Sequence, residues 1–559
     1  MMSTENKVLV IGLDGATFDI LNPLTLQGYM PHLASLMERG CWGRLSSTIP
    51  PFTAAAWSSF STGRNPGQHG VISFRGTRDR FNYDLQGEGF VDARRFENTL
   101  WEILSAEEKR VVIVNVPLTY PVRPVNGYIV TGMLTPSDAR VFTYPPGLSQ
   151  VLGEDYIIDV DFVRNENKFR VRGFPSKIEM ITQIRNMSKM RTWACASLMQ
   201  DEYWDFFMVV FTSTDRVLHF FWDDLETILE QGALKNGEIQ QHLQQYFREL
   251  DEGIGQLVDL AGPSATVLVV SDHGFGPAPT RRFYVNVWLE HLGLLQKRKS
   301  QGVFDLEHWR VVIGRNESLK KLLRRLLPQS VQDKSKEVAV STCGEIIDWS
   351  ETRAYFVPIY FHVCGVEINL AGARREGIVA PGKEYESLRT QIINEAQQLE
   401  DPVCGKPIVD KAFRREELYR GSYVDEFPDV ILILDPDYIA GGSLAGSSLV
   451  EHHVPMRPGE HRQDGIFIAS GEQIFAQGEQ VNLNLLDIPP TILYAMGLPV
   501  SSSFDGRVLK EIFDPVHLSA NPVKTSTRLF SSKDSSAHSY SESEVVDIEE
   551  RLRGLGYIE

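Results

Sequence analysis

Val8-Leu-Val-Ile-Gly-Leu13, followed directly by Asp14 and Gly15, is the stretch of sequence that decides the fold. It is a run of six apolar residues that stops at a charged residue and a turn residue, as a buried strand does. A secretory signal would need a small-residue cleavage site, and a membrane span needs about 18 apolar residues. We therefore interpret the run as a buried strand that ends in a carboxylate.

Similar apolar runs recur along the chain, with helical patterns between them. The other runs are Val111–Val116, Phe206–Phe211, Thr266–Val270 and Val430–Leu434. The expected helices are Met30–Arg39, Ile178–Met199, Glu238–Leu260 and, including a Pro-Pro pair, Asp487–Met496. Apolar strands that alternate with helices indicate a mostly parallel sheet covered by helices on both faces. The predicted fold class is α/β.

Two regions interrupt this alternation and set the expected domain boundaries. The chain is expected to divide into a first part of the core at 1–279, an inserted cap or second lobe at 280–425, a second part of the core at 426–519 and a polar tail at 520–559. A stretch at about 118–175, rich in Pro, Gly and charge, is predicted to be an insertion in the first part. The tail is expected to be poorly ordered over 520–543 and to carry a short amphipathic segment, Val545–Leu555.

The composition is that of a globular protein, with 42% hydrophobic and 23% charged residues among 559. The formal net charge of −17 repels phosphate backbones, so a nucleic-acid polymer is not an expected partner. A small phosphorylated substrate can still bind, because metal ions invert the local field. Five widely spaced cysteines without a CxxC motif favour a reducing compartment. We expect a cytoplasmic protein without a membrane association.

Side chains that can bind metals follow the strong strands. The candidates, each at a strand end or just beyond it, are Asp14, Asp215, His219, Asp272, His273 and His461. Because reactive groups gather at the carboxyl ends of strands in an open α/β sheet, we expect these side chains to lie together. Asp215 and His219 are four residues apart and would share one face of a helix. Asp272 and His273 end a buried strand, where two ionisable groups rarely lack a partner.

This set of side chains suits phosphoryl transfer at two divalent ions. Two ions roughly 3.5–4 Å apart can activate a hydroxyl nucleophile and bind the oxygens of the transferring group. Carboxylate and imidazole ligands suit Zn²⁺, with Mn²⁺ or Fe as alternatives. Taken singly, Asp14 can also cap a helix and His461 can be a surface residue. The spacing of Asp215 and His219 recurs at Asp534 and His538 in the tail, so the prediction rests on the whole set.

A hydroxyl that can serve as nucleophile occurs in the stretch Thr48-Ile-Pro-Pro-Phe-Thr53. Thr53 follows a Pro-Pro-Phe turn and opens a helix-compatible run. A helix N-terminus presents free N–H groups to an anion, and a hydroxyl there, near a metal, can attack phosphorus. The alternative is a Thr that only caps the helix.

Taken in order, these pieces resemble the alkaline phosphatase superfamily, and most of all its type I phosphodiesterase/nucleotide pyrophosphatase branch. The matching motifs are Gly-Leu-Asp14-Gly, Thr-Gly-x-x-Pro-x-x-His69-Gly within Thr48–Gly70, Asp215-x-x-x-His219, Ser-Asp272-His273-Gly, Gly-x-His461-Arg and the late stretch Leu486–Pro499 with Asp505-Gly-Arg. The resemblance covers roughly 7–115, 200–276 and 426–515. It implies an alkaline phosphatase-like core and a metal-dependent phosphohydrolase.

The resemblance also implies a role for each residue of the set. One divalent ion, most simply Zn²⁺, would be held by Asp14, Thr53, Asp272 and His273. The second ion would be held by Asp215, His219 and His461, with His452 and His453 as the alternative to His461. Thr53 would form a phospho-threonine intermediate, which water at the second ion then hydrolyses. His69 would be structural.

Two positions depart from the nucleotide pyrophosphatase pattern. In those enzymes an aromatic residue that stacks on the base follows the nucleophile, whereas Ala54 stands here. An Asn that holds a phosphate oxygen in those enzymes corresponds to Phe74. Nucleotide specificity and the support of the phosphate are therefore open, and Arg64 and Arg75 are candidate substrate-binding residues.

Other functions compete with a phosphodiesterase or nucleotide pyrophosphatase. A sulfatase would need Cys-x-Pro-x-Arg or Ser-x-Pro-x-Arg at the position of Thr53, and neither is present. A cofactor-independent phosphoglycerate mutase shares the ligand pattern but uses Ser. A phosphonate hydrolase, a phosphomutase of the same superfamily and a non-catalytic protein that binds a phosphorylated ligand stay as alternatives. The basic helix Lys320–Arg325 is expected to be a solvated face rather than a substrate entrance.

Overall fold

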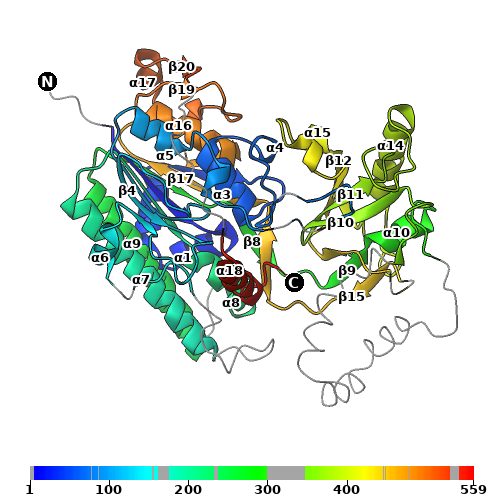
Figure 1. Cartoon of the computed structure of the whole chain (residues 1–559). Helices are drawn as coiled ribbons and strands as arrows, with labels where there is room; N and C mark the ends of the chain where they lie inside the picture. The colour runs from blue at the N-terminus through cyan, green and yellow to red at the C-terminus, as the bar shows by residue number, and fades with distance from the viewer. Residues whose placement is uncertain are drawn as a thin grey trace.

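The computed structural model describes residues 6–558 except 77, 86, 88, 154–155, 161–175, 232–236, 299–345, 445, 447, 476–477 and 529–539, and it leaves out the side chains of 201 and 227–231. The chain forms a large α/β part and a smaller second lobe beside it (Figure 1). The predicted basic helix Lys320–Arg325 and the pair Asp534 and His538 lie outside the described residues.

A nine-stranded sheet forms the centre of the large part, in the order β18-β2-β17-β7-β1-β6-β3-β4-β5. Its strands are β1 (Val8–Leu13), β2 (Cys41–Ser46), β3 (Val111–Val116), β4 (Gly127–Thr131), β5 (Thr143–Tyr144), β6 (Phe206–Phe211), β7 (Thr266–Val270), β17 (Asp464–Ser470) and β18 (Gly478–Asn484). β17 runs antiparallel to β2 and β7, and β5 antiparallel to β4. The other neighbours pair in parallel, which confirms the predicted α/β class.

Helices cover both faces of this sheet. One face carries α1 (Phe18–Leu26), α2 (Pro31–Glu38), α7 (Lys177–Asp201), α8 (Ser213–Gln231), α9 (Glu238–Ala261) and α18 (Glu542–Gly554). The other carries α3 (Thr53–Thr62), α5 (Leu100–Ala106) and α16 (Ile488–Ala495). In β1, Leu9 and Ile11 belong to the first hydrophobic core, whereas Val8 and Val10 belong to the second. A strand buried on both faces must be apolar throughout, which explains the run that opens the sequence.

The second lobe has its own sheets and its own hydrophobic core. A four-stranded antiparallel sheet contains β10 (Ala354–Tyr360), β11 (Val363–Ile368), β13 (Val430–Leu434) and β12 (Val409–Arg414). A three-stranded sheet contains β14 (Tyr438–Gly441), β9 (Arg281–Tyr284) and β15 (Val450–His452), and the lobe also includes α10 (Val285–His291) and α14 (Lys383–Gln397). The chain leaves for the lobe after β8 (Gly274–Pro277) and returns at β16 (Gly459–Arg462). β8 and β16 pair antiparallel, with Pro277 opposite Gly459.

Short elements complete the described fold. They are α4 (Pro66–His69), α6 (Leu148–Leu152), α15 (Arg415–Leu418), α17 (Pro515–Ala520), β19 (Val500–Ser501) and β20 (Thr525–Ser526). No helix among the described residues combines the length and apolar content needed to cross a membrane.

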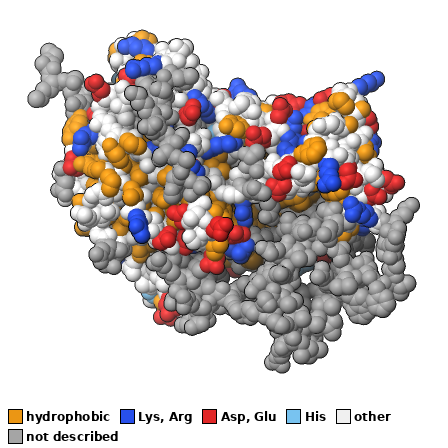
Figure 2. All heavy atoms as spheres, in the orientation of Figure 1, with side chains coloured by type: hydrophobic (Ala, Val, Ile, Leu, Met, Phe, Trp, Pro, Cys, Tyr) orange, Lys and Arg blue, Asp and Glu red, His pale blue; other side chains and the backbone are white. Residues whose placement is uncertain are grey.

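On the face drawn in Figure 2, acidic and basic side chains are interspersed over the second lobe. The negative net charge is therefore not gathered into one acidic patch on this part of the surface.

Three details of the described residues differ from the predicted domain organisation. β13 lies between β11 and β12 in the second lobe, so the chain does not return to the core at 426. An apolar run reports burial and not which sheet the strand joins. The stretch 118–175 is not simply an insertion, because β4 and β5 extend the main sheet. Within 520–543, Thr525–Ser526 pairs with β19 and α18 begins at Glu542, so these described parts are ordered.

A buried cluster of charges joins the two parts. Glu367 on β11 has a fully buried side chain and is paired with three arginines. Arg78 and Arg80 reach it from the loop that follows α4, with Arg80 Nε donating at 2.7 Å, and Arg374 reaches it within the lobe. The same loop stacks the ring of Tyr83 on Trp349, with ring centroids 3.8 Å apart. This loop therefore fixes the lobe to the large part through charge pairing and stacking.

Candidate active site

The predicted site residues meet at the carboxyl ends of three neighbouring strands. β1 lies between β6 and β7, so the residues that follow these strands come together. Asp14 follows β1, Asp215 lies in the first turn of α8 after β6, and Asp272 and His273 follow β7. All four side chains are buried. The order of the sheet explains how residues far apart in the sequence become neighbours.

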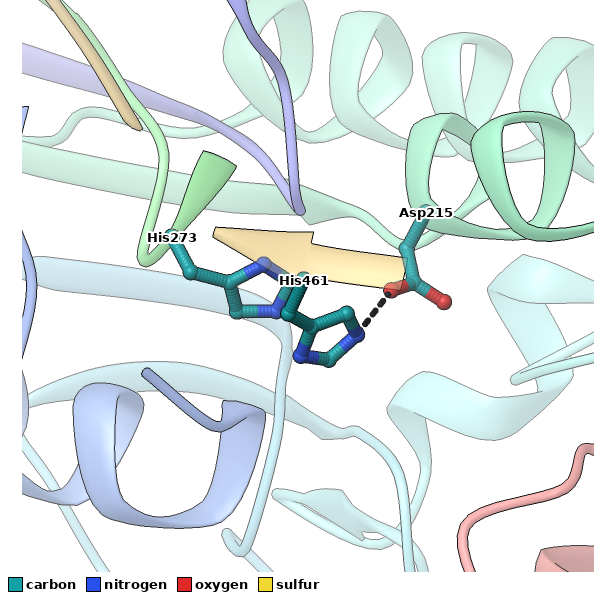
Figure 3. Close-up of side chains that lie close together, drawn as sticks. All are labelled: Asp215, His273 and His461. Carbon is teal, nitrogen blue, oxygen red and sulfur yellow. Dashed lines mark hydrogen bonds and ion pairs between the residues drawn. The ribbon is translucent and has the colours of Figure 1, made fainter. Parts of the chain in front are cut away.

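One half of the site consists of Asp215, His219 and His461. His461 comes from β16, which pairs with β8 next to His273. Its Nε2 lies 3.2 Å from Asp215 Oδ1 and 3.0 Å from His219 Nε2. His219 Nε2 lies 3.3 Å from the same carboxylate oxygen. Figure 3 shows the ring of His461 between Asp215 and His273; the two imidazole rings stack with centroids 3.6 Å apart.

The other half consists of Asp14, Asp272, His273 and Thr53. His273 Nε2 lies 3.6 Å from Asp14 Oδ1 and 3.3 Å from Asp272 Oδ2. Thr53 is the first residue of α3, and its Oγ1 lies 3.3 Å from the same ring nitrogen. The structure therefore brings together the candidate nucleophile and all six predicted metal-binding side chains.

The three histidines share one orientation. The Nδ1 atoms of His219, His461 and His273 lie 2.9, 3.1 and 3.1 Å from the carbonyl oxygens of Gly459, Pro51 and Gly274. A carbonyl oxygen only accepts, so each Nδ1 carries a proton, and Nε2 is the atom of each ring that can bind a metal. The Nε2 atoms of His219 and His461 lie 3.0 Å apart, close enough to bind one cation together. Metal-ligating histidines are oriented in the same way.

Two buried carboxylate oxygens point to the same conclusion. Asp14 Oδ1 and Asp272 Oδ2 have no hydrogen-bond partner among the described residues, although the second oxygen of each carboxylate has one. Asp14 Oδ2 accepts from Trp57 Nε1 at 3.1 Å, and Asp272 Oδ1 accepts from the Gly15 N–H at 3.1 Å. Buried polar atoms are normally paired. These residues therefore fit two divalent ions bound through nitrogen and oxygen, as Zn²⁺ is.

Burial decides the protonation of most of these groups. Burial, reinforced by neighbouring carboxylates, raises the pKa of Asp14 well above its ordinary value. Burial also raises the pKa of Asp272. The pKa values of His273 and His461 are lowered to about 4, mainly by burial. Metal ligands are expected to have neutral imidazoles and carboxyl groups with raised pKa values before the cations bind.

Asp215 differs because Arg216 and two histidines lie beside it. Although burial opposes ionisation, His219 and Arg216 lower the pKa of Asp215 well below its ordinary value. Arg216 is buried, donates to Asp215 Oδ2 and pairs with Asp159 at 2.6 Å. The hydroxyl of Tyr557 lies 2.7 Å from the same Asp215 oxygen. Arg216, Asp159 and Tyr557 were not predicted, and the adjacency of Asp215 and Arg216 was the only signal.

Comparison with known proteins now decides the family. A family model described as type I phosphodiesterase / nucleotide pyrophosphatase matches residues 8–454. The chain belongs to this family. It is therefore a hydrolase of the alkaline phosphatase superfamily. The match ends before His461, so the place of this residue in the site rests on the geometry.

Two solved structures with a TM-score of 0.50 show the same fold. Two structures of phosphonoacetate hydrolase from Sinorhizobium meliloti 1021, in complex with phosphonoformate and with phosphonoacetate, match with a TM-score of 0.50 and 16% identity, over 88% of this chain and 95% of that chain. Human ectonucleotide pyrophosphatase / phosphodiesterase 5 matches with a TM-score of 0.45 and 11% identity, over 91% of this chain and all of that chain. The comparison with curated proteins gave no match.

The departures from the nucleotide pyrophosphatase pattern have structural correlates in this family member. Phe74 packs on Phe52 and Tyr557, with ring centroids 4.8 and 5.5 Å apart, and forms an apolar wall instead of offering an amide. The first intrahelical bond of α3 runs from the Ala56 N–H to the Phe52 oxygen at 2.9 Å. The N–H groups of residues 53–55 precede that bond, so they face outward from the helix end beside the Thr53 hydroxyl.

The predicted substrate-binding residues Arg64 and Arg75 contact other side chains than Thr53. Arg64 follows the far end of α3, a helix roughly 15 Å long, and donates to Ser503 at 3.1 Å. Arg75 pairs with Glu549 of α18 at 3.0 Å. The length of α3 separates Arg64 from Thr53, and the side chain of Arg75 is already paired with a carboxylate.

The remaining predicted histidines lie apart from the metal-binding set. His452 is exposed on β15 of the second lobe, and His453 contacts Arg282 at 3.3 Å. Neither replaces His461. His69 Nδ1 accepts from the Val71 N–H at 3.2 Å, so its Nε2–H donates to Ser59 Oγ at 2.9 Å. These bonds join α4 to α3, in keeping with a structural role.

Proposed function

We propose that the chain is a phosphodiesterase that acts through a phospho-threonine intermediate on Thr53. The carrying observation is the convergence of three Nε2 atoms and of two carboxylate oxygens that have no hydrogen bond among the described residues, with the Thr53 hydroxyl 3.3 Å from one of these nitrogens. Asp14, Asp272, His273 and Thr53 would hold one divalent ion, and Asp215, His219 and His461 the other. Bound there, the ions would supply Lewis-acid stabilisation of the developing negative charge. We propose Zn²⁺, because the donors are imidazole and carboxylate, with Mn²⁺ or Fe as alternatives.

The chain's own groups supply the rest of the reaction. Thr53 is held at the start of α3, where its oxygen can attack phosphorus in line with the leaving alcohol. The Thr53 hydroxyl lies 3.3 Å from His273 Nε2, so an ion held by that nitrogen would also reach the hydroxyl oxygen, which gives up its proton to solvent water as it attacks. The N–H groups of residues 53–55 can donate to a phosphoryl oxygen, which takes over the task of the missing amide at Phe74. A second displacement, by water, would release the remaining phosphomonoester and restore the Thr53 hydroxyl.

A diester substrate is favoured by the local charge. Among the described residues, no Arg or Lys side chain hydrogen-bonds to Thr53, and Arg216 and Arg457 beside the site are paired with carboxylates. A phosphodiester brings one negative charge on the transferring group and a monoester close to two. Two dications and a helix N-terminus suit the smaller charge. We propose small phosphodiesters as substrates and a cytoplasmic location.

Metal removal is the first test. Purified wild-type protein is expected to hold two equivalents of divalent metal, and chelation should lower turnover of bis(p-nitrophenyl) phosphate by roughly 10³-fold or more, because the ions stabilise charge worth several kcal/mol. Elemental analysis and the rate before and after adding back Zn²⁺ or Mn²⁺ measure this. Protein that holds no divalent ion and turns over no ester would instead be a non-catalytic binder.

The same assay separates the alternative substrates. Bis(p-nitrophenyl) phosphate should be hydrolysed faster than p-nitrophenyl phosphate, and a nucleotide diester tests the base contact that Ala54 lacks. Faster release of phosphate from phosphonoacetate than from any ester would assign the alternative phosphonate hydrolase. Transfer of phosphate to a second acceptor without net hydrolysis would assign a phosphomutase.

A further inference from the structure

The segment 540–558 reaches the metal-binding side chains from outside the motifs. Figure 1 shows its helix α18, in dark red, beside α8. Ile548 and Leu552 are buried in the large core. Asp547 accepts from the N–H and the hydroxyl of Ser137, both at 2.8 Å, and Glu549 pairs with Arg75. The helix is thus held by an apolar face and by polar contacts at its edges.

A turn after α18 directs the chain into the site. The Gly556 N–H donates to the Arg553 oxygen at 3.0 Å, and the Tyr557 N–H donates to the Leu552 oxygen at 2.9 Å. This pair of bonds is a Schellman motif, which needs a left-handed residue at its centre. Gly556 has φ +75°, which glycine adopts without strain. The turn therefore places Tyr557 beside α8 rather than in solvent.

The hydroxyl of Tyr557 holds one oxygen of Asp215. Arg216 Nη1 can only donate, and it lies 2.8 Å from the Tyr557 oxygen. The Tyr557 proton is therefore free to go to Asp215 Oδ2, 2.7 Å away. The other oxygen, Oδ1, is the one that faces His219 and His461. Tyr557 and Arg216 together fix which oxygen of Asp215 is presented to the metal position.

The same segment also supports His461. Arg457 donates to the Leu555 oxygen and pairs with Glu460 at 3.2 Å. Glu460 Oε1 accepts from the backbone N–H of His461 at 3.1 Å and from Tyr360 at 2.5 Å. Glu460 could by position be a ligand with His219 and His461, but these bonds occupy its carboxylate. Two ligands of one ion therefore rest on residues 555–557.

We propose that Tyr557 is a positioning residue for Asp215, and that docking of segment 540–558 and occupancy of the Asp215, His219 and His461 metal position stabilise each other. The inference rests on the proposed function. Removal of a group that orients a metal ligand typically lowers metal affinity or activity by roughly 10–100-fold. Coupling follows from linkage, because whatever binds only the docked form also favours docking.

Tyr557→Phe tests the hydroxyl alone, since the ring that packs on Phe52 and Phe74 is kept. Full-length apoprotein is titrated with Zn²⁺ in competition with a chromophoric chelator. The variant should bind one equivalent as the wild type does and the other about 10–100-fold more weakly. Its Co²⁺ form should show an altered visible absorption for one of the two ions. Tyr540→Phe is the matched control, because the hydroxyl of Tyr540, in the same segment, donates to the Leu134 oxygen.

Hydrogen exchange tests the coupling. Amides of 542–554 should exchange more slowly in Zn²⁺-loaded wild type than in apoprotein, and this difference should shrink in Tyr557→Phe. Gly556→Ala keeps the hydroxyl but strains the turn, so it should weaken the same Zn²⁺ equivalent to a smaller degree. This variant decides the matter if Tyr557→Phe does not fold.

The outcomes separate this inference from the proposed function. Wild type that binds two Zn²⁺ and hydrolyses the diester, together with a Tyr557→Phe variant of unchanged affinity and spectrum, overturns the inference alone. Wild type that binds no Zn²⁺ overturns both. Equal weakening by Tyr557→Phe and Tyr540→Phe would show a general effect of the segment and would also overturn the role given to the hydroxyl.

Discussion

Thr53→Ala is expected to lower kcat for bis(p-nitrophenyl) phosphate by on the order of 10⁴- to 10⁶-fold, the range seen when a covalent nucleophile is removed. The variant should keep both metal ions, because six other side chains remain to hold them. It should also keep its thermal midpoint, since Thr53 Oγ1 contacts only His273 Nε2 among the described hydrogen bonds. Initial rates, elemental analysis and a melting curve measure these three quantities.

Thr53→Ser is the matched control, because it keeps a hydroxyl at the start of α3. It should retain most of the activity and, after an acid quench, carry a p-nitrophenyl phosphoryl group on the peptide that contains residue 53. Undiminished turnover in Thr53→Ala would reject Thr53 as nucleophile. Loss of activity together with loss of one metal ion would assign Thr53 a ligand role only.

Glu367→Ala is expected to lower the free energy of unfolding of the second lobe by about 3–5 kcal/mol, because removing one partner leaves buried charges without compensation. Three arginines would lose their shared carboxylate, and two of them, Arg78 and Arg80, come from the loop that joins the lobe to the large part. Denaturant unfolding followed by fluorescence of Trp349, which stacks on Tyr83 of that loop, reports on this junction.

The control is Asp437→Ala, which breaks the exposed pair with Lys406 in the same lobe and should change stability by less than about 1 kcal/mol. An equally small effect of Glu367→Ala would show that the arginines find other partners.

The dependence of stability on pH tests the same cluster. Despite burial, the arginines lower the pKa of Glu367 to about 2. Its contribution is therefore complete above its unfolded pKa of about 4.3 and is lost as the pH falls toward 2, a loss that Glu367→Gln should reduce.

Much of the fold could be predicted from burial patterns alone. The five apolar runs coincide with β1, β3, β6, β7 and β13, because a strand covered on both faces needs apolar side chains at every position. The partner of a strand is not encoded in that pattern, which is why β13 was assigned to the wrong sheet. β2 and β18 escaped prediction because β2 alternates buried residues with less buried ones, β18 is mostly exposed or half-buried, and both contain polar residues and Gly.

In the site, too, residues within sequence motifs could be predicted, whereas residues brought there only by folding could not. The seven predicted residues converge because sheet order and the pairing of β8 with β16 bring strand ends together. Tyr557 was missed because only the folded chain places it beside Asp215, 342 positions away. Arg64 was predicted because it is near Thr53 in the sequence, but α3 lies between the two residues and keeps them apart in space. The cytoplasmic location and the identity of the metals stay predictions.

The place where the second lobe joins the large part has an evolutionary consequence. Its two connections leave from Pro277 and Gly459, which face each other across one antiparallel ladder. Because the two ends of the second lobe lie side by side, the lobe can be exchanged for another inserted domain without moving the flanking strands. His461 lies within that ladder, opposite Phe275, and His273 directly precedes it. Substrate preference can therefore diversify by exchange of the lobe while the metal-binding residues are kept.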